Sequence, residues 1–245
     1  MKKMILLSTV LGVALLMTSC LGEGSRNYAE SSVAYIAQDD ISFAIYGKTL
    51  TGRIITSQQM QMMQPGTFKF LTYSWEEEYG QTKMGEFYLD NVVISGDPVS
   101  LNQTTLNMTE GPVQDVPVKF LAIDPPYYFN DENYLGDHWL FEFAYESKKG
   151  ERAVVNFYKI GDPEAVNNEI KIDIHLAVEG TPEAGSSVTS KTDIIALNMA
   201  PLRAAYEGTS QTATKELKIT FQYYLKGQEG PVDSQQSYRM IVAGD

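Results

Sequence analysis

Alternation of apolar and polar residues is the strongest pattern in this chain. In residues 170–178, Ile and Leu alternate with Lys, Asp and His, and residues 217–225 repeat the pattern with Leu, Ile, Phe and Tyr. A period of two is typical of β-strands that pack one face and leave the other in water. The two segments therefore predict two long strands with one buried face each.

Shorter segments of the same kind cover most of the remaining chain. Residues 57–63 could form about two helical turns with Met60 and Met63 facing inward, and we find no longer helical period. A hairpin is expected between residues 41–46 and 50–56, with its turn at Gly47-Lys48. Further strands are predicted at residues 41–46, 50–56, 67–75, 85–89, 92–94, 116–123, 139–145 and 153–160. The pattern predicts an all-β fold.

The strand pattern is interrupted once by turn-forming residues. Thr109-Glu110-Gly111-Pro112 separates a shorter first part from a longer second part. We expect a small barrel over residues 33–110 and an antiparallel two-sheet sandwich over residues 115–245.

The amino terminus has the layout of a secretory signal. Lys2 and Lys3 precede an apolar run over residues 4–17, which is shorter than the roughly 20 residues that span a bilayer. Small residues then lead to Cys20, the only cysteine, as in a bacterial lipobox. We predict that residues 1–19 are removed, that Cys20 is acylated, and that residues 20–32 form a flexible tether. Several acyl chains on one residue would anchor the protein durably.

Net charge limits the classes of partner. The formal net charge is -12, and loss of Lys2 and Lys3 would take it to -14. Such an acidic chain disfavours nucleic acid and anionic lipid head groups as ligands. We expect no nucleic-acid partner.

An aromatic loop is the main candidate for ligand binding. Two prolines precede Tyr127, Tyr128 and Phe129, and Trp139 follows soon after. Aromatic rings with polar handles suit sugar rings or a protein partner. The alternative is that these rings cover one end of the sandwich.

The loop that follows partly matches a calcium-binding spacing. Asp131, Asn133 and Asp137 supply oxygen atoms, and Gly136 and Glu142 also fit, but Leu135 occupies a ligand position. A polar connection is the preferred interpretation, with calcium as the weaker alternative. His138 and His175 show no zinc-ligand spacing, and we expect both to be surface or interface residues. No cofactor is expected.

Catalytic signatures are weak throughout. Asp39-Asp40 and Glu76-Glu77-Glu78 could supply two carboxylates for glycan hydrolysis, which needs them a fixed distance apart. No G-x-S-x-G elbow occurs. The sequence therefore favours a protein that is not an enzyme.

Three features of the chain form one pattern: the lipobox at Cys20, the small β-domain near residues 33–108, and the carboxyl-terminal half. In that half, residues 194–202 form an apolar segment that is expected to be a strand ending in a Pro-Leu turn, and residues 216–226 and 237–242 are expected to form a terminal hairpin. In this pattern the chain resembles the NigD-like lipoproteins of Bacteroidales. It implies an OB-like barrel followed by a β-sandwich, without catalytic residues. Many relatives have an acidic run after the cysteine. Here only Glu23 is present, so periplasmic and surface orientations both stay open.

The preferred interpretation is a lipoprotein of the cell envelope, associated with the outer membrane, with a non-enzymatic binding or structural role. Its expected partners are the membrane, through the lipid anchor, and an unknown protein or glycan. A bacteriocin immunity or inhibitor protein is the first alternative. A carboxylate-dependent glycan hydrolase is the second.

Overall fold

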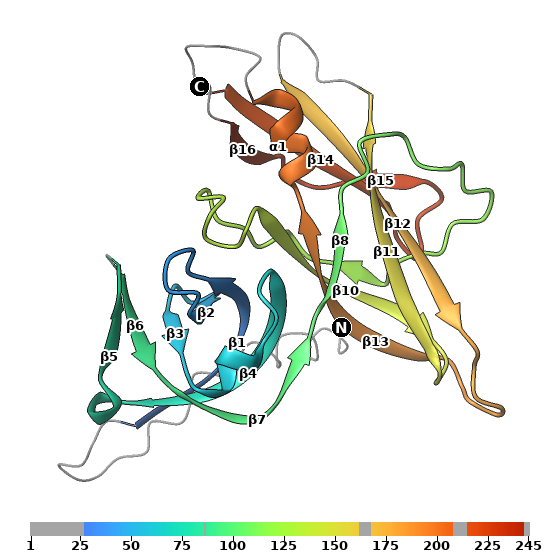
Figure 1. The fold of residues 1–245 in the computed structure, drawn as a ribbon. Helices are drawn as coiled ribbons and strands as arrows, with labels where there is room; N and C mark the ends of the chain where they lie inside the picture. Colours follow the sequence, from blue (N-terminus) through green and yellow to red (C-terminus); the bar gives the residue numbers. More distant parts are fainter. Residues whose placement is uncertain (1–26, 86, 162–167, 208–214, 243–245) are drawn as a thin grey trace, which may run out of the picture. The chain divides into compact units, whose positions relative to one another are not determined.

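The computed structural model describes residues 27–85, 87–161, 168–207 and 215–242. Contacts divide the chain into two compact units, residues 1–100 and residues 101–245. Figure 1 shows that β-strands dominate both units. The predicted all-β class is confirmed.

The first unit is a single seven-stranded sheet with the strand order β5-β6-β3-β2-β1-β4-β7. In the described residues, the outer strands β5 and β7 do not pair with each other, so the predicted barrel is not closed. The elements of this unit are β1 (Asn27–Gln38), β2 (Ile45–Thr49), β3 (Ile54–Thr56), the 3-10 turn η2 (Gln59–Met62), β4 (Thr67–Glu76), the 3-10 turn η3 (Glu77–Tyr79), β5 (Gln81–Met84), β6 (Phe87–Asn91) and β7 (Val93–Ser100).

One face of this sheet encloses a small apolar core. Ile36 of β1, Ile55 of β3 and Leu71 of β4 are fully buried there, and Met60 of η2 closes the core. The sequence predicted the inward position of Met60, and Met63 also packs against the core as expected.

The first hairpin lies a few residues later than predicted. Gly47 sits inside β2 and pairs with Ile55, while the chain turns at Gly52, whose φ of +86° suits glycine. A Cβ atom at position 47 would lie 2.7 Å from the Met60 Cε atom, so a larger residue there would require the end of the Met60 side chain to shift. Strand β1 also begins at Asn27, so the second half of the predicted tether is sheet.

The second unit contains two sheets. One has the order β8-β13-β10-β9, and the other has the order β11-β12-β14-β15, with β16 also paired to β14. The elements are β8 (Asn102–Thr105), β9 (Ala122–Ile123), β10 (His138–Ser147), β11 (Glu151–Ile160), β12 (Glu169–Gly180), β13 (Thr189–Asn198), the helix α1 (Ala200–Tyr206), β14 (Lys215–Tyr224), β15 (Pro231–Asp233) and β16 (Tyr238–Val242).

Aromatic side chains join the two sheets across the core. The Phe141 ring of β10 lies 5.1 Å from that of Phe157 in β11 and 4.9 Å from that of Phe221 in β14. Ile172 of β12 and Leu197 of β13, one from each sheet, are fully buried in the same core. The sandwich is mixed rather than purely antiparallel, because β14 runs parallel to β12 and β8 runs parallel to β13.

Two local predictions in this unit are wrong. Residues 116–123 form only the two-residue strand β9 and single bridges, such as the one between Val118 and Leu176. The segment predicted to end in a turn at Pro201 instead begins α1, with proline in the first helical turn, where its missing N–H costs nothing. Leu202 of this helix is buried in the sandwich core.

Candidate functional site

The predicted aromatic loop divides into a buried part and a partly exposed part. Trp139 is only 3% exposed and lies in the sandwich core. The ring of Tyr128 stacks on it, with 4.1 Å between ring centroids and 15° between planes. These two rings are therefore structural in this conformation, and they cannot form the open platform that the sequence suggested.

Tyr127 and Phe129 lie on the outside of that stack. Tyr127 is 46% exposed, and its ring lies 5.6 Å from Phe129, which in turn lies 4.2 Å from Tyr134. Burial, followed by the influence of Tyr127, raises the pKa of Tyr134 to about 12. Of these three aromatic residues, Tyr127 is the exposed one, and its ring packs against Phe129. Backbone hydrogen bonds with Leu140 fix the position of Tyr127.

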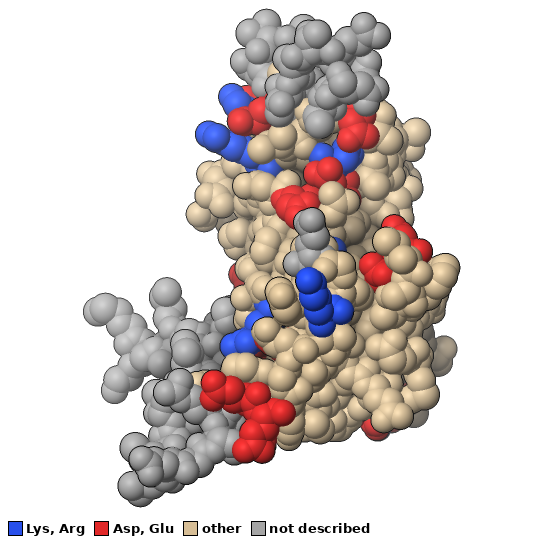
Figure 2. Space-filling view, turned by 60° about the vertical axis from the view of Figure 1, so that its left-hand side comes forward, with Lys and Arg blue, Asp and Glu red and all other residues tan. Residues whose placement is uncertain are grey.

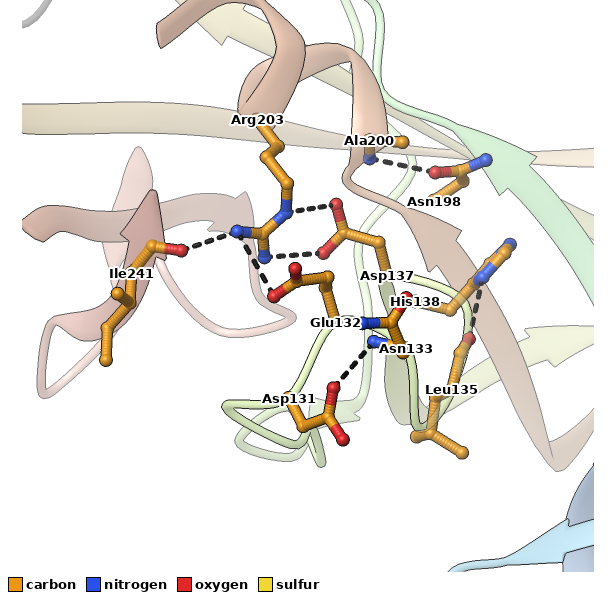
Figure 3. A network of polar contacts seen from close by, with 10 residues as sticks. All are labelled: Asp131, Glu132, Asn133, Leu135, Asp137, His138, Asn198, Ala200, Arg203 and Ile241. Carbon is orange, nitrogen blue, oxygen red and sulfur yellow. Dashed lines mark hydrogen bonds and ion pairs between the residues drawn. The ribbon is translucent and has the colours of Figure 1, made fainter. Parts of the chain in front are cut away.

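The calcium-like loop is closed by a guanidinium group. Arg203 of α1 donates to both carboxylate oxygens of Asp137, at 2.9 and 3.0 Å (Figure 3). Asp131 accepts a hydrogen bond of 2.9 Å from the backbone N–H of Asn133, which stabilises the loop locally. Leu135 is buried. Among the residues that the structure describes, no group of three or more His, Cys, Asp or Glu side chains is arranged to hold a metal ion.

Arg203 also joins this loop to the last strand. Its guanidinium donates to the backbone carbonyl of Ile241 in β16 and lies 3.6 Å from a carboxylate oxygen of Glu132 (Figure 3). The side chains of Arg203 and Asp137 are nearly buried. We therefore assign this network, the Arg203 clasp, to structure: it ties the loop, α1 and β16 together.

The structure gives different surroundings to the two histidines, which were both predicted to be surface or interface residues. His175 is buried, and its Nε2 atom lies 2.8 Å from an oxygen of Asp173. A Cβ atom at Gly111 would lie within 2.9 Å of the rings of Tyr158 and His175, so the chain around Gly111 covers this outer face. His138 is half-buried beside the Leu135 carbonyl, and burial lowers its pKa.

A groove in the first unit was missed by the sequence analysis. It has a volume of about 640 Å³, which is within the usual range for ligand sites. Its walls come from three separate stretches of chain: the turn before β2, the segment from β3 into η2, and the β5–β6 hairpin. The lining side chains include Ile41, Thr56, Gln61, Met84 and Leu89. No local motif joins such distant stretches, so only the folded chain shows the groove.

The turn on one side of the groove is held in a fixed conformation. The carboxylate of Asp39 accepts hydrogen bonds of 2.7 Å from the backbone N–H and from the hydroxyl of Ser42, and these bonds lower its pKa. Phe43 has a φ of +59°, which is unusual for a bulky residue and is stabilised by the N–H of Phe43 bonding to the Asp39 carbonyl. Ile41 is 90% exposed, and Phe43 is also largely exposed.

Carboxylates do not gather in this groove. Asp39 is the one acidic side chain among the described residues that line it. A two-carboxylate hydrolytic mechanism needs a partner acid across the cleft. Figure 2 shows a largely uncharged face on which acidic side chains gather at the lower left and separate acidic and basic groups lie above.

The predicted acylation site, Cys20, lies outside the described residues, as do residues 1–19 and the first part of the tether. Among the helices that the structure describes, none is both long enough and apolar enough to cross a bilayer.

Comparison with known proteins shows that this chain resembles several solved structures in its fold. No family model matches the sequence, and no curated protein matches it. Solved structures do match over most of the chain. One is an uncharacterized protein from Parabacteroides merdae, with a TM-score of 0.58 and 10% identity, covering 87% of this chain and 99% of that one.

Two further structures carry functional names. A candidate lipoprotein from Bacteroides fragilis matches with a TM-score of 0.54 and 11% identity, covering 88% of this chain and 99% of that one. A NigD-like immunity protein from Bacteroides caccae matches with a TM-score of 0.51 and 11% identity, covering 87% of this chain and 96% of that one. The resemblance to NigD-like lipoproteins is confirmed at the level of the fold, which is all that such low identity shows.

Proposed function

We propose that this protein is a lipid-anchored protein of the bacterial cell envelope that binds a protein partner through the groove of its first unit and catalyses no reaction. The anchor would be Cys20, in the lipobox described above. The fold likeness to a candidate lipoprotein supports this placement. The outer membrane is the membrane we propose.

The groove and its apolar rim carry the binding proposal. Ile41 and Phe43 extend into solvent from a turn whose backbone is fixed, and Met62, beside the groove residue Gln61, is also exposed. Single exposed apolar residues are common, but several around one hollow mark an interaction surface. Aromatic residues and methionine are enriched at protein interfaces. A rigid turn would present them with little ordering cost on binding.

The second part of the proposal is that the protein catalyses no reaction. It is supported by the single carboxylate among the described lining residues of the groove and by the structural role of the Asp137 carboxylate in the Arg203 clasp. The carboxylates that the sequence offered for hydrolysis, at positions 39–40 and 76–78, lie on the first unit's turns and strand ends.

Site-specific photocrosslinking in living cells tests the groove. We expect p-benzoylphenylalanine at position 41, and separately at position 43, to give one discrete adduct of the same partner after irradiation. The matched control is position 113, because Val113 is 93% exposed and Ile41 is 90% exposed, yet Val113 lies in the second unit.

The outcomes separate the alternatives. An adduct at 41 and 43 but not at 113 supports the proposal, and the identity of the captured protein distinguishes the roles. A secreted toxin would assign the immunity role that the name of the Bacteroides caccae protein suggests. The same adducts at all three positions, or none at any, would contradict binding in the groove.

A further inference from the structure

One edge of the first unit's sheet lies along the groove. β5 is the end strand on that side of the sheet and, among the described strands, pairs only with β6 (Figure 1). Its residues Thr82, Lys83 and Met84 also line the groove. The outer side of such a strand offers backbone N–H and C=O groups to another strand. We call this side of Gln81–Met84 the β5 edge.

The register of the β5–β6 pairing decides which backbone groups face outward. The N–H of Asn91 donates to the Gly80 carbonyl, at 3.2 Å, so these two residues form a hydrogen-bonded pair. Bonded and non-bonded pairs alternate along an antiparallel ladder. Thr82 is therefore bonded to β6, whereas Gln81 and Lys83 direct their backbone N–H and C=O groups away from it. Each of these two residues offers one donor and one acceptor to an added strand.

The opposite edge of the sheet is protected in a way that β5 is not. β7 contains Pro98, which has no backbone N–H, and Gly96, which has a φ of +72°. Proline and irregular backbone both prevent pairing at a sheet edge. β5 contains neither. Its charged side chain, Lys83, has its Nζ atom 6.0 Å from the centre of the Tyr88 ring in β6, so this charge lies above β6 and not beyond the edge.

The lining of the groove favours apolar side chains in a ligand. Gln61 uses both polar atoms of its amide on the backbone of Ile45, at 2.9 and 2.7 Å. Asn91 accepts a hydrogen bond from the Thr82 hydroxyl and donates one to the Tyr79 carbonyl. These amides therefore hold the walls of the groove together, and recognition depends mainly on the apolar residues beside them.

An added strand would present every second side chain to those apolar residues. Thr82 and Met84 share the groove side of β5, and Phe87, which is opposite Met84, is 58% exposed. Side chains of an added strand that are paired with Thr82 and Met84 would lie on the same side, because paired residues share a face. Ile41, on another wall of the groove, is 90% exposed. The groove therefore suits a strand with apolar residues at alternate positions.

The charge at the groove indicates a further property of that strand. Asp39 and Asp40 precede β2, and hydrogen bonds from Ser42 lower the pKa of Asp39, so this carboxylate stays ionised. An acidic wall favours a lysine or arginine in the bound segment. A second copy of this chain suits the site less well, since it would bring the same acidic turn and a formal net charge of -12.

We propose that the protein partner enters the groove as an extended segment that pairs with the β5 edge, with apolar residues on the Met84 side and a basic residue near Asp39. This inference rests on the proposed function, because it states how the groove holds its partner. Strand addition takes affinity from backbone hydrogen bonds and specificity from alternate side chains.

Proline at position 83 tests the backbone pairing. Because the Lys83 N–H faces outward, Lys83→Pro removes a bond to the added strand and none to β6. Lys83→Ala is the matched control, because it also removes the lysine side chain but keeps the N–H. Both changes are made in the strain that carries p-benzoylphenylalanine at position 41. We expect Lys83→Pro to lower the yield of the adduct about tenfold and Lys83→Ala to leave it within about twofold.

Two further measurements keep the test independent of how one variant folds. Gln81→Pro and Gln81→Ala repeat the comparison at the other outward N–H, and thermal unfolding of the purified proteins shows which variants keep the fold. Mass spectrometry of the adduct identifies the crosslinked segment in the parent strain, without either proline. We expect that segment to alternate apolar and polar residues and to contain a lysine or arginine.

The outcomes separate this inference from the proposed function. No adduct at position 41 in the parent strain would contradict both. An adduct that folded proline variants leave unchanged would mean that the partner binds the groove without strand pairing, which overturns this inference alone. Equal loss with proline and alanine would assign the effect to the side chain and also overturn it. So would a crosslinked segment without the alternating pattern, or one that comes from a second copy of this chain.

Discussion

Replacing Arg203 with methionine is expected to lower the free energy of unfolding by about 3 kcal/mol, because it leaves the nearly buried carboxylate of Asp137 without its cation. Methionine keeps much of the apolar stem, so the loss reports on the charge and its hydrogen bonds. The carbonyl of Ile241 in β16 also loses a donor. Urea denaturation followed by circular dichroism measures the change.

A surface arginine provides the control for this effect. Arg239 forms an exposed ion pair with Glu216, at 3.3 Å, and exposed pairs contribute little. Arg239→Met should therefore cost no more than about 0.5 kcal/mol. In a double-mutant cycle, Arg203→Met with Asp137→Asn should cost clearly less than the sum of the two single changes. Additive costs would mean that the clasp does not couple these residues.

Replacing Trp139 with alanine is expected to cost about 4 kcal/mol, because the indole lies in the sandwich core against Tyr128, Phe221 and Tyr238. Tyr128→Ala should also destabilise the protein strongly. Tyr127→Ala should cost less than about 1 kcal/mol, since nearly half of that side chain is already in water. Thermal unfolding of the three variants measures the order of these effects.

This order decides the role of the aromatic loop. If Trp139→Ala and Tyr128→Ala melted like the parent protein, the two rings would be accessible and the open platform expected from the sequence would be restored. The expected result leaves Tyr127, with Phe129 behind it, as the part of the loop that a ligand could touch.

Local patterns were sufficient for the long strands. Residues 170–178 alternate because β12 packs one face on the core, and the burial of Ile170, Ile172 and Ile174 follows that period. The exposure of the polar face of β12 was harder to predict. His175 has the position of a surface residue in the alternating pattern, but the chain around Gly111 covers it. The residues near His175 in the sequence do not indicate a contact with so distant a segment.

The short elements were predicted wrongly for a related reason. Residues 116–123 have the composition of a strand, yet they meet the sheets only through the two-residue strand β9 and single bridges, because both sheets take their main partners from elsewhere. The helix α1 follows a strand directly and has only seven residues, too few for a helical period to show.

The candidate sites show the same limit. The aromatic loop and the calcium-like spacing are continuous in sequence, so they could be found, but burial and Arg203 give them structural roles. The groove is assembled from separate strands and turns. Its lining residues carry no common spacing, so only the folded chain brings them together.

The anchoring of the chain at Cys20 is the claim on which its place in the envelope depends. Mass spectrometry of the amino-terminal peptide, from protein purified out of bacterial membranes, tests it most directly. We predict a peptide that begins at Cys20 and carries a diacylglycerol group on the sulfur. A peptide that begins upstream of Cys20, or one with an unmodified cysteine, would contradict the proposed lipoprotein.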